Sequence, residues 1–156
     1  MGELSKLTIS AAREQLKKGN ITAVELTNDC LSKAKKASAL NAFCLITEEL
    51  ALHQAAMADK RIADKKDQAL TGIPLGVKDI FCTKGIKTQA ASEILAGFIS
   101  PYESTVTNKL WNSGAVMVGK LNMDEFAMGS SNETSIYGPC INPWKSKSDD
   151  DARLTP

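Results

Sequence analysis

The chain has 156 residues, of which 43% are hydrophobic and 24% are charged, so it is long enough to bury a substantial core. Its 19 basic and 18 acidic side chains leave a net charge of +1, without the basic surplus typical of direct nucleic-acid binders. This balance still allows a role in RNA metabolism through partner subunits. The longest apolar runs are far shorter than the roughly 20 residues needed to span a bilayer, so we expect no membrane partner.

The N-terminus and the cysteines indicate the cellular compartment. Residues 1–6 lack the apolar segment of a secretory signal and the Arg-rich amphipathic character of a mitochondrial transit peptide. The chain has one histidine, and its cysteines are scattered without a C-x-x-C pair, at Cys30, Cys44, Cys82 and Cys140. This pattern is typical of reduced intracellular thiols rather than of a zinc site or a disulfide framework. We therefore expect a cytoplasmic protein without a metal or cofactor, and the mitochondrial matrix stays open as an alternative.

The first 66 residues are predicted to be mainly helical. The predicted helices cover 8–18, 22–37 and 48–65, with a short strand at 41–47 between the second and the third. Gly19 is suited to ending the first helix, because glycine readily adopts the left-handed conformation of a C-cap. Thr22 is a candidate cap for the second helix, and Glu25 stands at the capping-box position three residues later.

After residue 66 the pattern changes to short apolar strands separated by turns. The predicted order is a Gly/Pro-marked turn leading into a strand at 71–82, a helix at 104–113, a strand at 115–118 and a loop-rich stretch at 123–143. The end of the chain, 145–156, is polar and has no candidate core residue besides Leu154. Helices that alternate with short apolar strands favour an α/β layered domain. We expect 1–156 to be part of a single domain, with 1–66 as a helical segment and 67–156 as the first part of its core.

Three patterns resemble catalytic sites but lack the context that such sites need. His53 lies in the middle of a predicted helix, where a solvated or packed histidine is the usual interpretation. The segment 114–121 matches half of a P-loop, but Leu121 stands where a Ser or Thr must bind Mg²⁺. Ser32 and Lys35 have S-x-x-K spacing, yet both lie on the polar face of their helix, where a solvated lysine stays protonated.

Lys78 differs from these because it lies in an apolar strand, between Val77 and Ile80. Burial of its amine would disfavour the ammonium form and make the lysine a candidate base. From the residues alone, a structural ion pair of Lys78 with Asp79 is the simpler interpretation. The loop 128–133 gathers small hydroxyl and amide groups beside a glycine, which suits either ligand binding or a solvated turn.

Taken together, two segments resemble the amidase-signature family. The stretch G-I-P-L-G-V-K-D at 72–79 looks like the lysine strand of that family. The run from 104 to 144, with N-M-D-E-F-A-M-G-S-S at 122–131, is similar to the glutamine-hydrolysing members that serve tRNA-dependent amidotransferases. The resemblance covers nearly the whole chain and implies a mixed β-sheet covered by helices.

The resemblance also implies roles for individual residues. Lys78 would be the lysine of a Ser–cis-Ser–Lys triad, which reverses the preference for a structural pair with Asp79. Met128 and Ser130 would line the substrate pocket. In the family, the two serines and a glycine-rich turn follow a Thr-Pro like Thr155-Pro156, and this sequence ends there. We therefore expect residues 1–156 alone to be inactive, because loss of one triad member already costs several powers of ten in rate. We also expect an exposed sheet edge.

The implied activity is hydrolysis of glutamine to supply ammonia to a partner subunit, in a heterotrimer with B and C subunits whose small third member would stabilise the assembly. The partner would use ATP and Mg²⁺ to amidate Glu-tRNA(Gln) or Asp-tRNA(Asn), so mischarged tRNA would also bind there. Two alternatives stay open: a stand-alone amide hydrolase of the same family, and a non-catalytic truncated product.

Overall fold

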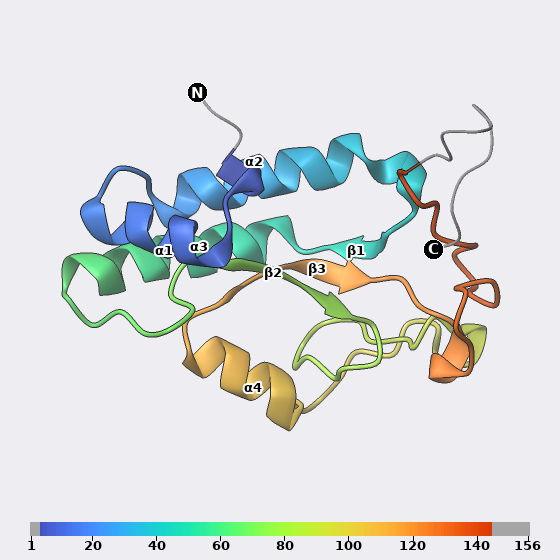
Figure 1. Ribbon diagram of the computed structural model, residues 1–156. Helices are drawn as coiled ribbons and strands as arrows, with labels where there is room; N and C mark the ends of the chain where they lie inside the picture. The colour runs from blue at the N-terminus through green and yellow to red at the C-terminus, as the bar shows by residue number, and fades with distance from the viewer. Residues whose placement is uncertain (1–3, 145–156) are drawn as a thin grey trace.

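A computed structural model describes residues 4–144, and it is built around a small mixed sheet. The strands are β1 (Phe43–Ile46), β2 (Pro74–Lys78) and β3 (Val116–Leu121). β3 is the central strand, antiparallel to β1 and parallel to β2 (Figure 1). The predicted α/β class is therefore confirmed, and so are the three predicted strands, although their bounds are shifted by a few residues.

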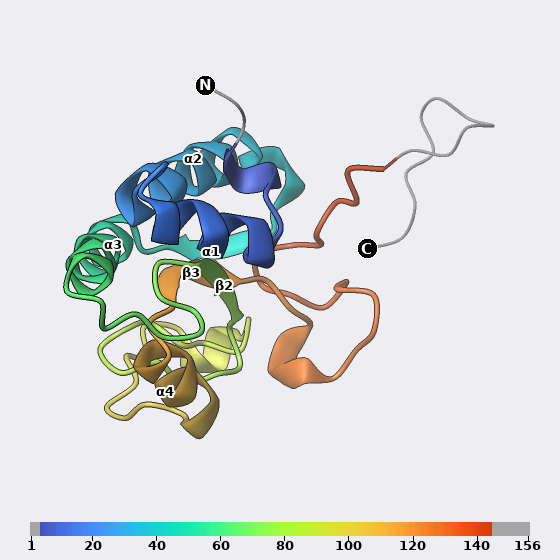
Figure 2. The ribbon, with the colours of Figure 1, turned by 60° about the vertical axis from the view of Figure 1, so that its left-hand side comes forward.

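Helices cover both faces of this sheet. The helices are α1 (Ile9–Lys18), α2 (Ala23–Lys36), α3 (Glu48–Ala63) and α4 (Thr105–Asn112). Four single 3₁₀ turns accompany them at Leu4–Lys6, Ser38–Leu40, Glu93–Leu95 and Glu125–Ala127. α1, α2 and α3 lie on one side of the sheet, whereas α4 and the long segment after β2 lie on the other (Figures 1 and 2). All four predicted helices are present.

The helix ends follow from local capping chemistry. Thr22 accepts a hydrogen bond from the backbone N–H of Glu25, and the Glu25 side chain accepts one from the backbone N–H of Thr22. This reciprocal pair is the predicted capping box. Gly19 ends α1 with φ of 70°, as predicted for a glycine C-cap.

The main core lies between the helices and the sheet. Small side chains let α2 and α3 approach each other closely, since Ala23, Ala51 and Ala55 are all fully buried. Branched side chains of the sheet complete the cluster, with Val116 and Val118 from β3. Removal of this apolar surface from water is the main favourable term in forming the platform that carries the loops beyond it.

β3 contains an irregularity that matters for the site. Leu75 of β2 pairs with Met117, but the next residue, Gly76, pairs with Gly119, so one residue of β3 is extra. Side chains bond to the backbone of Met117, directly before the extra residue: its N–H donates to Gln54 at 2.7 Å, and its carbonyl accepts from Thr47 at 3.0 Å. Such a bulge re-aims the side chains that follow it.

The bulge explains why Val118 and Lys120, two residues apart in β3, point to opposite faces of the sheet. Val116 and Val118 pack in the helix-side core, whereas Lys120 reaches the segment 81–88 on the other side. Strict alternation would place Lys120 on the same face as Val118. Gly119 makes room for the crossing, because a Cβ atom there would lie 2.2 Å from the carbonyl oxygen of Leu45.

The sheet has open edges within residues 4–144. β2 is bonded to β3 on one side, and no strand of the described chain flanks its other side. The predicted exposed edge is confirmed for this part of the chain. No helix between residues 4 and 144 is long and apolar enough to cross a membrane. The polar stretch 145–156, with Leu154 and the Thr155-Pro156 pair, lies outside the described residues.

Two glycine substitutions distinguish a glycine needed for close contact from a glycine needed for its left-handed backbone. Gly119→Ala should destabilise the protein by about 3 kcal/mol, because the new methyl group overlaps the β1 backbone. Gly19→Ala should cost about 1 kcal/mol, because its site is open and only the left-handed backbone opposes a side chain. Urea unfolding of the purified whole protein measures both. A smaller cost at Gly119 than at Gly19 would contradict the assigned close contact.

Candidate functional site

A shallow hollow forms where β2 and β3 end. Lys78 is the last residue of β2, and Asn122 directly follows β3, so parallel pairing brings them to one edge of the sheet. Carboxyl ends of parallel strands are a common place for ligand sites. The residues that line the hollow are Lys78, Asn122, Met123, Asp124, Gly129, Ser130, Ser131, Asn132 and Cys140.

The structure thus brings together two of the three predicted site residues. Lys78 and Ser130 line the same hollow although 52 positions separate them in sequence (130 minus 78). Met128 is not among the lining residues and is 74% exposed. Ser130, which the resemblance assigns to the substrate pocket, lines the hollow beside Lys78, whereas Met128 stands beside the hollow rather than in its wall.

The predicted burial of Lys78 is wrong for the described chain. Its side chain is exposed and makes no hydrogen bond or ion pair within residues 4–144. The physical reason is its position at the end of an edge strand, on the side away from the buried Val77 and Asp79. The residues directly before and after it point into the protein, and the lysine between them points out of it.

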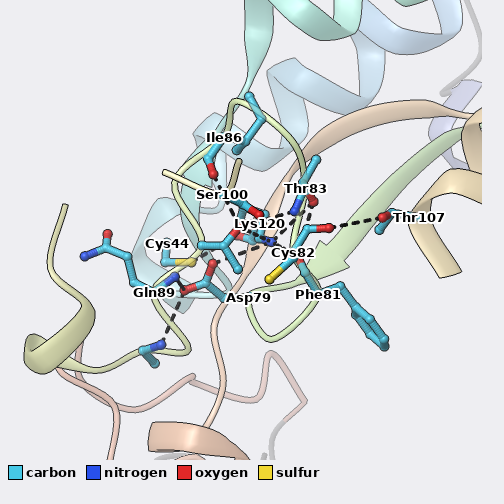
Figure 3. Close-up of polar contacts among 12 residues, drawn as sticks. Cys44, Asp79, Phe81, Cys82, Thr83, Ile86, Gln89, Ser100, Thr107 and Lys120 are labelled. Carbon is cyan, nitrogen blue, oxygen red and sulfur yellow. Dashed lines mark hydrogen bonds and ion pairs between the residues drawn. The ribbon is translucent and has the colours of Figure 1, made fainter. Parts of the chain in front are cut away.

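The alternative pairing of Lys78 with Asp79 is also wrong. Asp79 is 2% exposed and lies 3.8 Å from the ammonium group of Lys120, which itself has no exposed surface. The second carboxylate oxygen of Asp79 accepts backbone N–H groups of Gln89, at 3.1 Å, and Ala91, at 3.3 Å (Figure 3). Asp79 therefore ties the end of β2 to the loop at 89–91 and to the central strand.

Burial opposes the charged form at both members of this pair. It raises the pKa of Asp79, against the backbone N–H of Ala91 and the ammonium of Lys120, which both lower it. It likewise lowers the pKa of Lys120, and the carboxylate of Asp79 acts in the opposite direction. Each charge compensates the desolvation of the other, which is why two buried ionisable groups can coexist here.

A second carboxylate, that of Asp124, organises the loop that carries Ser130. It accepts the backbone N–H groups of Asn132, Glu133 and Thr134, at 2.8 to 3.2 Å. These contacts hold the pKa of Asp124 below its usual range, the backbone N–H of Thr134 first among them. Gly129 packs directly against the carboxylate, since a Cβ atom there would lie 2.3 Å from its Cγ. The loop is thus ordered by specific hydrogen bonds, although residues 128–130 are exposed.

Two asparagines fasten the far side of this loop to the sheet. The Asn122 side chain donates to the carbonyls of Asn41 and Gly138, both at 2.9 Å. The Asn41 side chain donates to the carbonyls of Tyr137, Gly138 and Pro139. These bonds hold 137–139 against the ends of β1 and β3, and so close the loop around the hollow.

The other sequence candidates lie away from this hollow. His53 is exposed on α3 and lines a separate groove with Trp111. Ser32 and Lys35 are exposed on α2, and Lys35 forms an ion pair with Glu48 at 2.6 Å. The segment 116–121 is a β-strand rather than a phosphate loop. The sequence-based rejection of these three patterns agrees with their positions.

The cysteines are free thiols, and none forms a disulfide. Cys44 donates its S–H to the carbonyl of Lys120 at 3.4 Å, and burial raises the pKa of its thiol to about 12. Within the described ranges, no group of three or more His, Cys, Asp or Glu side chains is arranged to hold a metal ion.

Sequence reasoning missed Asp79, Lys120 and Asp124 as organising residues. Lys120 was considered only as the lysine of a failed P-loop. A charged residue at the end of an uninterrupted apolar run is the signal that could have indicated its burial, since an unpaired buried charge is very costly. Asp124 carried no comparable signal, because its partners are backbone N–H groups eight to ten residues later.

Comparison with known proteins identifies the family of the chain. The family model described as Amidase matches residues 25–149, which is most of the chain. The chain belongs to the amidase family. A curated relative, the A subunit of glutamyl-tRNA(Gln) amidotransferase from Dinoroseobacter shibae, is 58% identical over 156 residues. That match covers all of this chain and 31% of the relative, so the chain spans about a third of the length of such relatives.

Solved structures confirm that the fold is part of an amidase fold. Native peptide amidase from Stenotrophomonas maltophilia superposes with a TM-score of 0.81 at 26% identity, over 90% of this chain and 31% of that one. The A subunit of glutamyl-tRNA(Gln) amidotransferase from Thermotoga maritima superposes with a TM-score of 0.66 at 31% identity, over 92% of this chain and 29% of that one.

Replacement of the loop-organising carboxylate should loosen the loop. Asp124→Asn should speed amide hydrogen exchange at 132–134 by at least about tenfold, because an amide cannot accept all three backbone N–H groups. Asp64→Asn, at an exposed carboxylate after α3, is the matched control. In the wild type, the ionised Asp124 stabilises the loop fully at pH values above 3.8, its ordinary pKa. This stabilisation is lost as the pH falls through the lowered pKa of Asp124 in the folded protein. Unchanged exchange in Asp124→Asn would contradict the assignment.

Cys44 should be nearly inert in the native protein. A pKa of about 12 against an ordinary 9.0 lowers the thiolate fraction at pH 8 by about 10³. Iodoacetamide should therefore alkylate Cys44 about 10³ times more slowly in the native protein than in urea, as read by peptide mass spectrometry. Comparable native and unfolded rates would show that this thiol is not buried as described.

Proposed function

We propose that the whole protein hydrolyses glutamine as the glutaminase subunit of a tRNA-dependent amidotransferase. The observation that carries this proposal is the shared hollow of Lys78 and Ser130, in a chain 58% identical over its full length to the A subunit of a glutamyl-tRNA(Gln) amidotransferase. Residues 1–156 would supply the lysine and the substrate loop. As expected from the sequence, 1–66 would be a helical segment and 67–156 the first part of the catalytic core.

Lys78 would act as the base of the reaction. Lys78 lines the hollow, and its exposed side chain has no partner within residues 4–144, so its amine is available to a hydroxyl group from another part of the protein. In neutral form it would take the proton of a bridging serine, which in turn deprotonates a nucleophilic serine. Attack on the side-chain amide of glutamine would give a glutamyl ester and ammonia, and water would then hydrolyse the ester.

The loop after β3 would bind the substrate. Ser130 offers a hydroxyl group in the wall of the hollow, and Met128 offers an exposed, flexible thioether beside it. Asp124 fixes the backbone between 129 and 134, so the position of Ser130 is set before substrate arrives. The backbone N–H groups of 132–134 are already bonded to Asp124, so they would not stabilise an oxyanion.

Partner subunits would use the ammonia that this protein releases. They would bind ATP, Mg²⁺ and the mischarged tRNA, Glu-tRNA(Gln) or Asp-tRNA(Asn), in a heterotrimer that forms in the cytoplasm. The net charge of +1 supports this division, because residues 1–156 carry no basic surplus for tRNA.

A stand-alone amide hydrolase is the second candidate. Its support is the TM-score of 0.81 with a peptide amidase, which exceeds the 0.66 with the solved amidotransferase structure. The two candidates predict the same role for Lys78 but different substrates. Purification with or without copurifying subunits separates them, as does a comparison of glutamine with a simple aliphatic amide.

Replacement of Lys78 in the whole protein tests the proposal. Lys78→Met, assayed with the partner subunits as glutamate release from glutamine, should lower kcat by about 10⁴, because the triad loses its base. Lys84→Met is the matched control, since it removes an exposed lysine from the adjoining loop, and it should keep wild-type kcat. We expect residues 1–156 produced alone to show no activity. A kcat for Lys78→Met within about tenfold of wild type would contradict the proposal.

A further inference from the structure

The most heavily buried charge of the described chain, Lys120, lies outside the hollow and has no role in the reaction outlined above. Its side chain has no exposed surface, and its ammonium group lies among backbone and hydroxyl oxygens of the segment that follows Lys78 (Figure 3). A buried ammonium needs several partners to offset its lost hydration. The hydrogen-bond partners of Lys120 therefore show which segment of the chain it anchors.

The hydrogen-bond pattern around Lys120 suits its ammonium form. Its Nζ donates to the carbonyl of Phe81 and to the hydroxyl oxygens of Thr88, at 3.2 Å, and Thr83, at 3.5 Å. Both hydroxyl protons are already used, because Thr83 donates to the carbonyl of Phe81 and Thr88 to that of Ile86. All three oxygens are therefore placed to accept from Lys120, which matches the three N–H bonds of an ammonium group.

The same contacts fix the backbone on the C-terminal side of Lys78. The N–H of Phe81 donates to the carbonyl of Lys78 at 3.1 Å, and the carbonyl of Phe81 accepts from Lys120. The turn 78–81 is thus closed at Lys78 and held at its other end by the buried ammonium. Asp79, the next residue after Lys78, lies 3.8 Å from the same ammonium and bonds to the backbone at 89 and 91.

On the N-terminal side, strand pairing fixes the lysine. Val77 pairs with Lys120 and Lys78 with Leu121 in the parallel ladder, and the N–H of Asp79 donates to the carbonyl of Leu121 at 3.0 Å. The exposed side chain of Lys78 therefore stands on a backbone that is held before, at and after it. Flexibility is confined to its own side-chain torsions.

We propose that Lys120 is a positioning residue for Lys78: paired with Asp79, its ammonium anchors the turn 78–81 and so aims the Lys78 amine into the hollow. This inference rests on the proposed role of Lys78 as the base. Lys120 is not itself the base, because its N–H bonds are all engaged and its side chain is closed to the hollow. The buried pair acts through the backbone.

The test compares three variants of the whole protein with its partner subunits. Lys120→Met removes the ammonium and leaves Asp79 buried without a counter-charge. The double variant Asp79→Asn with Lys120→Met removes both charges and keeps an oxygen for the N–H groups of Gln89 and Ala91. Met117→Ala is the control, because it truncates another fully buried side chain of the same strand that carries no charge.

We expect kcat for glutamine to fall about 10² in Lys120→Met and in the double variant, while KM changes by less than about threefold, since a misplaced base impairs the chemical step rather than binding. The double variant should have the higher Tm of the two, because it leaves no unpaired buried charge. It also keeps the test decisive where Lys120→Met does not fold. Met117→Ala should lower Tm and keep kcat within about threefold of wild type, measured well below its Tm.

Two results would overturn the inference. One is wild-type kcat in the double variant, and the other is an equal loss of kcat in Met117→Ala, which would make the role of Lys120 purely one of stability. A wild type that hydrolyses a simple aliphatic amide but not glutamine refutes the proposed substrate alone, and the same variants then decide the inference on that amide. A wild type that hydrolyses neither refutes both.

Discussion

A single buried ammonium group, that of Lys120, joins the central strand to the segment on which the candidate site depends. Within the 79–91 segment, this ammonium contacts the carbonyl of Phe81, two threonine hydroxyls and the carboxylate of Asp79, and these contacts hold the segment together. Removal of one charge of such a buried pair leaves the other charge without a counter-charge. The resulting free-energy cost destabilises all the hydrogen bonds of the group. The arrangement thus couples the geometry beside Lys78 to the integrity of the core.

The remaining architecture delivers this ammonium to its place. The helix-side core of α1, α2 and α3 holds β3 in the centre of the sheet, and the bulge before Gly119 turns Lys120 to the opposite face. Gln54 of α3 and Thr47, which precedes α3, bond to the backbone of Met117 directly before the bulge, so the irregular part of β3 is held from the helix side. On the other side of the hollow, Asp124 does for the substrate loop what Asp79 does for the lysine: one carboxylate gathers backbone N–H groups that are distant in sequence.

Much of the fold could be predicted from the sequence, because its helix ends and central strand depend on interactions between residues close in sequence. Thr22 with Glu25 and Gly19 mark helix ends through contacts of a few residues, and the apolar run at 115–118 marks the central strand. The resemblance of 72–79 and 122–131 to the amidase family located Lys78 and Ser130, which the structure brings to one hollow. The partner of Asp79 could not be predicted in this way, since it depends on a one-residue bulge in another strand. The burial expected for Lys78 failed for a related reason: apolar neighbours in sequence do not bury a residue that alternates to the open side of an edge strand.

The account rests on Lys78 as a base aimed by a buried pair, and a crystal structure of the whole protein with an acyl group trapped from glutamine tests it most directly. We expect the Nζ of Lys78 within about 3 Å of a serine hydroxyl that contacts the acylated serine. We expect the ammonium of Lys120 beside Asp79 as it is here, at 3.8 Å. A Lys78 amine that points to solvent in that acylated state, with no serine within reach, would contradict the account.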